Sequence, residues 1–384
     1  MDSEPSPASG WPAARPLVKW TGGKSAELAF IGQALPAAAG RHIEPFVGGG
    51  AVLFAQPASL WAEVNDRSGD LIALYREMAA LDPAFLSALE AIEESWTAVG
   101  RIDPLLPDPR LATETRRGCA SLARLVPGLD EDAGQAALAA LARKRRFIAR
   151  LGTGARGSPG PLLMAALKGA AYTAVRAAFN RSAPGTVRSA MFWFLREFAY
   201  GGMFRTNSAG GFNVPYGGIS YNARGMAPRF EQMASPGIRA RLARCGLHCG
   251  DFEAFLDRAR LRHDDFVFLD PPYDSAFSTY DGNAFTRADH CRLAGCMARM
   301  PAKWMLVIAA TDFVRETYAA VPGARTVEFG KTYQGHILNR NDRGAVYLMI
   351  TNYGIPAPDC ARRGTERLQG RLQAAGELAD GMPA

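Results

Sequence analysis

Three short runs of apolar or mixed residues, each closed by an acid, a glycine or a proline, constrain the fold of this chain most strongly. They are Arg41–Glu44 before Pro45-Phe46-Val47-Gly48-Gly49-Gly50, Leu60–Val64 before Asn65-Asp66, and Phe266–Leu269 before Asp270. Such runs are typical of parallel strands whose carboxyl ends carry a site. Further strands are predicted at 304–310 and 345–352, with helices at 70–79 and 287–300. The sequence therefore predicts an α/β protein with a largely parallel sheet.

A long stretch from 82 to 242 interrupts this alternation of strands and helices. It is rich in Ala and Arg, has helical patterns at 131–150 and 162–178, and becomes rich in Gly and aromatic residues from 192 to 221. We interpret it as a mainly helical domain inserted into a sheet domain of residues 17–81 and 243–355. Residues 1–16 are expected to form a disordered tail, and residues 356–384 a polar tail with one helix near 365–375.

Composition sets broad limits on the chain. It has 384 residues, 48% of them hydrophobic, which suffices for two or three domains. A net charge of +7 suits a polyanionic partner without identifying one. No apolar run approaches the roughly 20 residues that span a bilayer, and no secretion signal is visible, so we expect a cytoplasmic protein with no membrane partner. The six cysteines form no paired CxxC sets, which favours reduced, mostly buried thiols over a metal site.

The glycines at 48–50 form a nucleotide-type turn after the first strand. Glycine lets the backbone approach a ligand where a side chain would collide. Asp66 follows Gly48 by 18 residues, and an acid at about that distance is placed to bond ribose hydroxyls. The spacing therefore indicates an adenosine-containing ligand, although a plain strand–helix turn gives the same pattern. No GxGxxG or GxxxxGK[ST] motif is present, which argues against NAD and ATP.

The segment Asp270-Pro271-Pro272-Tyr273 carries the clearest chemistry. Two prolines fix an extended backbone, so that they hold a carboxylate, a carbonyl and an aromatic ring in a rigid array. The amine of adenine is a poor nucleophile because its lone pair is delocalised. Acceptors at Asp270 and the Pro271 carbonyl would stabilise the charge that develops on it, while Tyr273 could stack on an extruded base. A proline-stiffened turn is the structural alternative.

These motifs, in this order, resemble the Dam-like (D12 class) DNA adenine methyltransferases. The matching segments cover roughly residues 17–80 and 190–355, and they are Lys19-Trp20-Thr21-Gly22-Gly23-Lys24, Glu44–Gly50, Asn65-Asp66, Tyr200–Asn207, Phe212–Gly217, Asp270–Tyr273 and Val346–Tyr353. The resemblance implies a Rossmann-like seven-stranded methyltransferase sheet, dependent on S-adenosyl-L-methionine, with an inserted helical target-recognition domain. The implied reaction is methyl transfer to the exocyclic N6 amine of a flipped adenine in double-stranded DNA.

The resemblance also implies roles for individual residues. Asp270, Pro271, Pro272 and Tyr273 match the catalytic loop. The residues that match cofactor contacts are Trp20, Lys24, Glu44, Phe46, Gly48, Asp66, Asp251 and Asp270. Among these, Trp20 and Lys24 match a loop over the methionine part, Asp66 the ribose acid, and Asp251 the acid at the adenine ring.

On the DNA side, the resemblance points to Tyr200, Arg205 and Asn207. Arg205 matches an arginine that reads guanine in GATC-specific relatives, a base that suits the arginine fork. Gly201 and Ser220 depart from those relatives, so the target sequence stays open. The basic run Arg143-Lys144-Arg145-Arg146, with Arg150, lies on a predicted helix that either grips phosphates or is solvated.

Three alternatives stay open from the sequence. The same amine chemistry could act on cytosine N4 or on an RNA adenine, although Asp at position 270 favours adenine in DNA. A catalytically silent DNA-binding relative is the third reading, against which the intact Lys24, Asp66, Asp270 and Tyr273 argue. The sequence also leaves open the oligomeric state and whether a cognate restriction endonuclease accompanies the protein.

Overall fold

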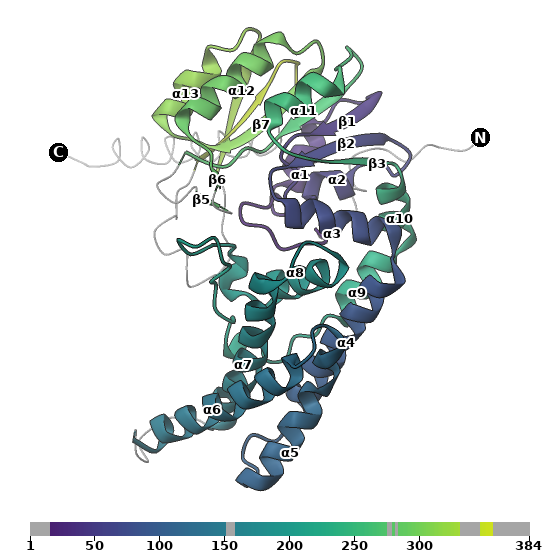
Figure 1. Cartoon of the computed structure of the whole chain (residues 1–384). Coiled ribbons are helices and arrows are strands. Elements are labelled where there is room, and N and C mark those ends of the chain that lie inside the picture. The colour runs from purple at the N-terminus through teal and green to yellow at the C-terminus, as the bar shows by residue number, and fades with distance from the viewer. Residues whose placement is uncertain (1–15, 151–157, 275–278, 281–282, 331–345, 356–384) are drawn as a thin grey trace, which may run out of the picture.

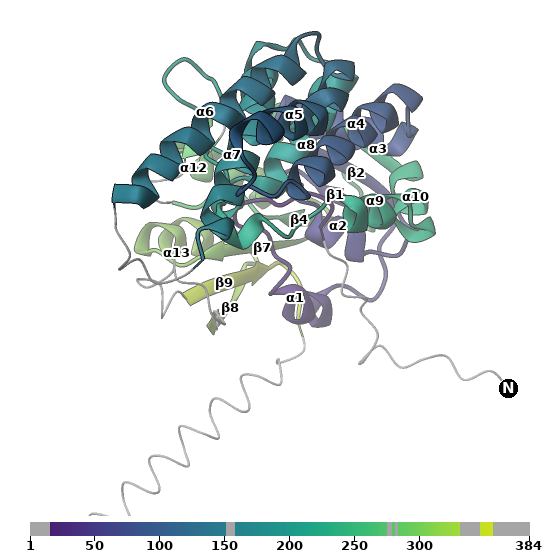
Figure 2. The ribbon, with the colours of Figure 1, turned by 90° about the horizontal axis from the view of Figure 1, so that it is seen from below.

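The computed structural model describes residues 16–150, 158–274, 279–280, 283–330 and 346–355. Both expected tails, apart from Pro16, lie outside the described residues, as does the helix expected near 365–375. Figure 1 shows a sheet flanked by helices, with a helical region extending below it. Seen from below, α5 (Asp108–Cys119) and α6 (Leu129–Arg150) lie nearest the viewer (Figure 2).

The sheet has seven strands in the order β3-β2-β1-β4-β7-β9-β8. Their bounds are β1 (Arg41–Glu44), β2 (Trp61–Asp66), β3 (Cys245–Cys249), β4 (Phe266–Leu269), β7 (Lys303–Ala309), β8 (Arg325–Gly330) and β9 (Val346–Thr351). The pairs from β3 to β7 are parallel, whereas β9 runs antiparallel to both β7 and β8. The predicted fold class is confirmed: this is a Rossmann-like methyltransferase sheet with seven strands. A short antiparallel pair, β5 (Thr279–Tyr280) and β6 (Asn283–Ala284), follows β4.

Helices cover both faces of the central strands, which explains why β4 and most of β7 are continuous apolar runs. Along β4, Phe266 and Phe268 pack with α1 and α2, while Val267 and Leu269 pack on the opposite face with α11, α12 and α13. This alternation follows from the two-residue period of a strand. The covering helices are α1 (Leu28–Ala34), α2 (Ala51–Ala55), α11 (Phe252–Ala259), α12 (Arg287–Arg299) and α13 (Asp312–Ala319).

Two strands of the sheet were not predicted individually, and both are edge strands. β3 is half-exposed and carries Gly246 and His248, while β8 alternates exposed and partly buried residues. Neither contains the buried apolar run that identified β4 and β7, because an edge strand has fewer neighbours to bury it.

The stretch between β2 and β3 is helical. After α3 (Gly69–Ala80), its elements are α4 (Pro83–Gly100), α5, η1 (Ala120–Arg124), α6, α7 (Gly160–Arg181), α8 (Thr186–Phe198), η3 (Tyr200–Gly202), η4 (Ile219–Tyr221), α9 (Ala227–Ala234) and α10 (Pro236–Ala243). α8 is buried from Ser189 to Phe198 and packs against both α3 and α4. One hydrophobic cluster therefore runs from β2 and α3 into the helices.

Among the described helices, α7 is the one that is long and apolar enough to cross a membrane by length and composition. It packs against α6 and α8, and 56% of its apolar window is buried inside the protein. Its apolar surface is therefore largely accounted for by the helical core.

Candidate active site

The predicted site residues meet at the carboxyl edge of the sheet. β3, β2, β1 and β4 are neighbours and all parallel, so their carboxyl ends lie on one edge. Glu44, Asp66, Asp251 and Asp270 close or directly follow these strands. In open α/β sheets, ligands bind at such an edge where the strand order reverses, which here is between β1 and β4.

The glycine turn after β1 is held by its neighbours on both sides. The Gly48 amide donates to Asp66 Oδ2 over 3.0 Å, and the Tyr75 hydroxyl donates to the Gly48 carbonyl over 2.8 Å. Gly48 has a φ of +47°, and a Cβ there would lie 2.7 Å from Cδ1 of Trp20. Glycine is required at this position both by the backbone conformation and by the approach of Trp20.

Asn65 ties three strand ends together. Its buried Nδ2 donates to the carbonyls of Pro45, at 3.1 Å, and Gly250, at 3.0 Å. The Gly250 amide in turn donates to the Asp66 carbonyl over 3.1 Å. These bonds fix the loops after β1, β2 and β3 relative to one another. Sequence reasoning placed Asn65 in a motif but missed this bridging role, because its partners lie 20 and 185 residues away.

Lys24 joins the loop before β1 to the loop after β4. Its side chain is only 2% exposed, and its ammonium group donates to the Asp270 carboxylate, to the Tyr273 hydroxyl at 2.9 Å and to the Gly22 carbonyl at 3.1 Å. The same ammonium lies 5.0 Å from the centroid of the Tyr273 ring. One buried cation therefore fixes the carboxylate and the aromatic ring at the two ends of the Asp-Pro-Pro-Tyr segment.

Acidic side chains gather at this edge. Burial raises the pKa of Glu44 well above its usual value, and the neighbouring carboxylates of Asp270 and Asp66 raise it further. Glu44 Oε2 lies 3.1 Å from Nε2 of buried His42, whose pKa is lowered to about 3 by burial and by Arg241. His42 is therefore neutral and does not compensate the acids. A ligand with positive charge would be favoured here. In the described part of the chain, no group of three or more His, Cys, Asp or Glu side chains forms a metal site.

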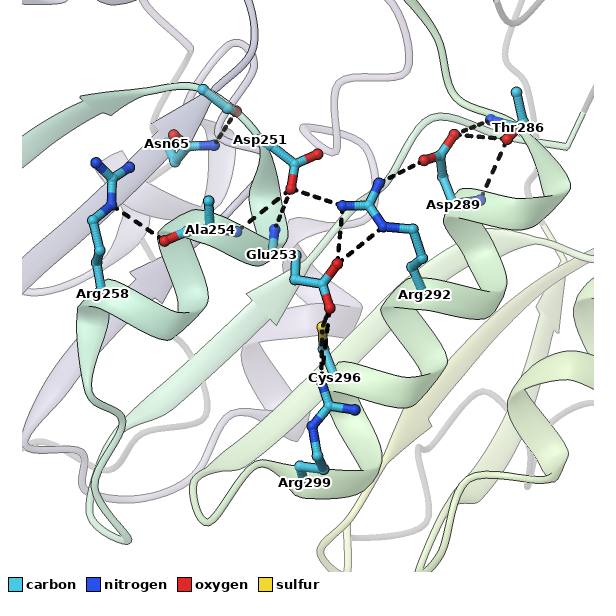
Figure 3. Close-up of polar contacts among 11 residues, drawn as sticks. Asn65, Asp251, Glu253, Ala254, Arg258, Thr286, Asp289, Arg292, Cys296 and Arg299 are labelled. Atoms are coloured by element: carbon cyan, nitrogen blue, oxygen red, sulfur yellow. Dashed lines mark hydrogen bonds and ion pairs between the residues drawn. The ribbon is translucent and has the colours of Figure 1, made fainter.

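Aromatic rings lie beside Asp251. Phe46 contacts Phe252 and Phe285, with centroid distances of 5.4 and 5.7 Å. Asp251 caps the amino end of α11, because its Oδ1 accepts from the amides of Glu253 and Ala254 at 3.0 and 3.4 Å (Figure 3). Apolar ring faces next to a carboxylate suit a planar heterocycle with a hydrogen-bond donor.

The predicted DNA-contacting residues lie on a loop that touches the Trp20 loop. Arg196 of α8 is fully buried, donates to the Lys19 carbonyl at 2.9 Å, and places its guanidinium 4.6 Å from Trp20 and 5.1 Å from Phe204. Phe204 directly precedes Arg205. Sequence reasoning missed Arg196, because nothing near it in the sequence indicates a contact 177 residues away.

The three predicted DNA residues differ in their surroundings. Tyr200 is 37% exposed, and Arg205 is exposed with its Nε 3.3 Å from Asn213 Oδ1. The side-chain oxygen of Asn207 accepts from the amides of Ala209 and Gly211 at 3.0 and 2.9 Å. That oxygen therefore holds the loop in shape.

Two other expectations need correction. Of the five described cysteines, Cys249 and Cys291 are exposed and only Cys119 and Cys296 are buried, so the thiols are not mostly buried. Within the basic run of α6, Arg145 makes structural contacts: it pairs with Asp108 at 2.6 Å and donates to the carbonyls of Pro104 and Leu106. Its packing against the loop before α5 explains why it is not part of a free basic surface.

Comparison with known proteins agrees with this geometry. The model of the D12 class N6 adenine-specific DNA methyltransferase family matches residues 20–97 and 163–333. The match contains Lys24, the glycine turn, Asp66, Asp251 and Asp270. It omits residues 98–162, which include α5 and α6.

Individual relatives are similar at modest identity. The type II methyltransferase M.CviBI of Paramecium bursaria Chlorella virus NC1A is 26% identical over 345 residues, covering 88% of this chain and all of that protein. The retron Ec67 DNA adenine methylase of Escherichia coli is 26% identical over 309 residues, or 79% of this chain and 80% of that one. The DNA adenine methylase of Vibrio cholerae is 33% identical over 129 residues, or 32% and 43%.

Proposed function

The chain belongs to the D12 class N6 adenine-specific DNA methyltransferases, and we propose that it transfers a methyl group from S-adenosyl-L-methionine to a flipped adenine at a specific sequence in double-stranded DNA. Its activity as an adenine-specific DNA methyltransferase follows from the family; the donor, base flipping and the roles of individual residues are our proposal. The observation that carries it is the buried Lys24, which fixes Asp270 and Tyr273 at the edge where Glu44 and Asp66 gather.

The acidic edge supports the identity of the methyl donor. S-adenosyl-L-methionine supplies an electrophilic methyl group on a positively charged sulfur, and its net charge is positive. Burial and the neighbouring carboxylates of Asp270 and Asp66 make ionisation of Glu44 costly, as its raised pKa records, so a cationic ligand would be stabilised beside these acids. Asp66 would accept from the ribose hydroxyls, Asp251 from the adenine amine, and Phe46 would cover the ring. Trp20 and Lys24 would enclose the methionine part, and Gly48 leaves the backbone open beside it.

The catalytic loop would act by orienting and stabilising the target amine. The Asp270 carboxylate and the Pro271 carbonyl would accept hydrogen bonds from its two N–H groups, which would localise the nitrogen lone pair, stabilise the positive charge that develops on the nitrogen and orient the amine in line with the methyl group of the donor. Pro271 and Pro272 keep the backbone extended without competing amides. Lys24 keeps the carboxylate in place, and Tyr273 stacks on the extruded base. No protein nucleophile is required by this arrangement.

The helical stretch 82–242 would serve as the target-recognition domain, with 17–81 and 243–355 as the catalytic domain. Tyr200 would fill the space left by the flipped base, Arg205 would read a base edge, and Asn207 would hold the loop that presents them. A protein that methylates chromosomal or phage DNA would work in the cytoplasm, alone or beside a cognate restriction endonuclease.

The proposal is tested by incubating the full-length protein and deuteromethyl-labelled S-adenosyl-L-methionine with DNA or RNA of random sequence. Mass spectrometry of the digested nucleosides is expected to find label in N6-methyldeoxyadenosine only. Label in N4-methyldeoxycytidine, or only in RNA, would overturn the choice of acceptor. Long-read sequencing of DNA from cells that express the protein is expected to show one methylated motif; scattered methylation would overturn sequence specificity.

A further inference from the structure

A single guanidinium group links the two helices that flank the proposed adenine side of the site. Arg292, on the second turn of α12, donates to Asp251 Oδ1 at 2.8 Å, to Glu253 Oε2 at 3.0 Å and to Asp289 Oδ1 at 2.8 Å (Figure 3). Asp251 and Glu253 begin α11, while Asp289 belongs to the capping box of α12. The arginine therefore joins the strand end that carries Asp251 to the helix that follows the catalytic loop.

The two oxygens of Asp251 are placed in different surroundings. Oδ1 receives Arg292 and the amides of Glu253 and Ala254, which fill its acceptor capacity. Figure 3 shows the other oxygen with no contact to the residues drawn. The side chain is 37% exposed, so ligand can reach it. The contacts of Oδ1 therefore orient the carboxylate and leave its second oxygen available as an acceptor.

The ring cluster beside this oxygen includes Arg292 itself. The guanidinium lies 4.8 Å from the centroid of Phe252, and Phe252 contacts Phe46. Arg292 consequently fixes both the carboxylate and one aromatic ring of the same subsite. A carboxylate oxygen can only accept a hydrogen bond, so a ring with an amine at that point is favoured and a ring with a carbonyl there is repelled.

We propose that Arg292 is a positioning residue for the methyl donor: by holding Asp251 Oδ1, it directs the other oxygen to the 6-amino group and makes the site selective for adenine over hypoxanthine. This inference rests on the proposed function, because it requires that the adenosine part of the donor binds beside Asp251. It assigns selectivity to a residue that does not itself touch the ligand.

The chain offers a matched control on the same helix. Arg299 also pairs with Glu253, at 3.7 Å, but it has no contact with Asp251 among the described residues. Both arginine side chains are exposed, at 40% for Arg292 and 66% for Arg299, so truncating either removes little core packing. A difference between the two variants therefore reports the contacts that Arg292 makes and Arg299 lacks, which are those with Asp251, Asp289 and the Phe252 ring.

The test measures dissociation constants of S-adenosylhomocysteine and S-inosylhomocysteine by titration calorimetry. These two probes differ only at the 6-position of the purine. The wild-type protein is expected to prefer the adenine compound by about 100-fold or more, because the second Asp251 oxygen would face a carbonyl oxygen in the inosine compound instead of an amine. R292A is expected to reduce this preference to under about tenfold, R292K to an intermediate ratio, and R299A to leave it unchanged.

The outcomes separate the inference from the function on which it rests. If R292A weakens both ligands equally and keeps their ratio, Arg292 is structural only and the inference is overturned. If the wild-type protein binds neither compound, the proposed donor is wrong and the inference falls with it. Thermal unfolding without ligand checks the fold of each variant; should R292A not fold, the ratio measured with R292K decides the question in the same way.

Discussion

Charged side chains are paired with one another at the carboxyl edge of the sheet, whereas several are exposed on the arm formed by α5 and α6 (Asp108–Arg150). At the edge, Lys24, Asp270 and Tyr273 come from distant parts of the chain and satisfy one another at fixed positions. On the arm, Arg143 and Arg146 are exposed on a regular helix. The family model includes the edge and omits the arm. The edge is thus held by buried contacts between distant segments, whereas these arginines of the arm are held only by the packing of a regular helix.

The largest expected effect lies at the edge. Replacing Asp270 with Ala removes the acceptor for the target amine, so methyl transfer should fall by about 1,000-fold or more. Binding of S-adenosylhomocysteine and of DNA should change by no more than a few-fold, because the substitution leaves Asp66, the glycine turn at Gly48 and the arm unchanged. Single-turnover rates and titration calorimetry check this, and a rate within tenfold of wild type would remove the edge from its catalytic role.

Lys24→Met tests whether the contacts of Lys24 at the edge also stabilise the folded protein. The substitution leaves Asp270 without its buried cation, and the free energy of unfolding should fall by about 2–4 kcal/mol. Lys19→Met is the matched control, because Glu197 keeps Arg229 as a partner at 2.9 Å. The control should lose less than about 1 kcal/mol. Denaturant titration of both variants measures the free energy of unfolding. Equal decreases would mean that the contacts of Lys24 stabilise the fold no more than those of Lys19 do.

The arm is tested by reversing its charge. Arg143, Arg146 and Arg150 are exposed at spacings of three and four residues, so they share one face of α6. If that face grips phosphates, changing all three to Glu should weaken binding to every DNA sequence by about 10- to 100-fold and lower the salt slope by about 2.7. The rate at saturating DNA should stay unchanged.

The control for the arm reverses the same amount of charge elsewhere. Arg258, Arg262 and Arg299 are exposed and precede parallel strands at the edge opposite the site. Reversing these three should change DNA affinity by less than the arm variant does. Fluorescence anisotropy over a range of salt concentrations measures both, and identical responses would show that net charge alone, not the arm, governs affinity.

The smallest effect concerns pH. The pKa of Glu44 is raised in the folded protein by burial, Asp270 and Asp66, so the folded state keeps a proton that the unfolded chain releases near pH 4.5. Stability present below that pH is therefore lost as the pH rises toward the folded pKa, by up to about 1.4 kcal/mol per pH unit. Glu44→Gln should flatten this part of the profile. Parallel slopes for the two proteins would show that Glu44 is not buried as an acid.

The sequence predicted the buried strands and the motif residues of the site, but not the edge strands or the residues that position the site. β1 and β4 were predicted to the residue, because each is a buried run stopped by a polar or proline segment that the site requires. β3 and β8 were missed, since edge strands need no apolar run. The site residues followed from motifs, whereas the residues that position them did not. Asn65, Arg196 and Arg292 act on partners tens to hundreds of residues away, and only the fold brings those pairs together.

The pairing of β2 with β3 has a consequence for how the protein is made. β2 ends at Asp66 and β3 begins at Cys245, so all of the helices from α3 to α10 are translated between two strands that become neighbours. At roughly 5–20 residues per second, β2 waits on the order of 10–40 s for its partner. During that time its backbone is an open edge next to a nascent helical bundle, a state that favours chaperone capture. The edge that gathers Asp66, Asp251 and Asp270 therefore cannot be completed until all of the inserted helices have been translated.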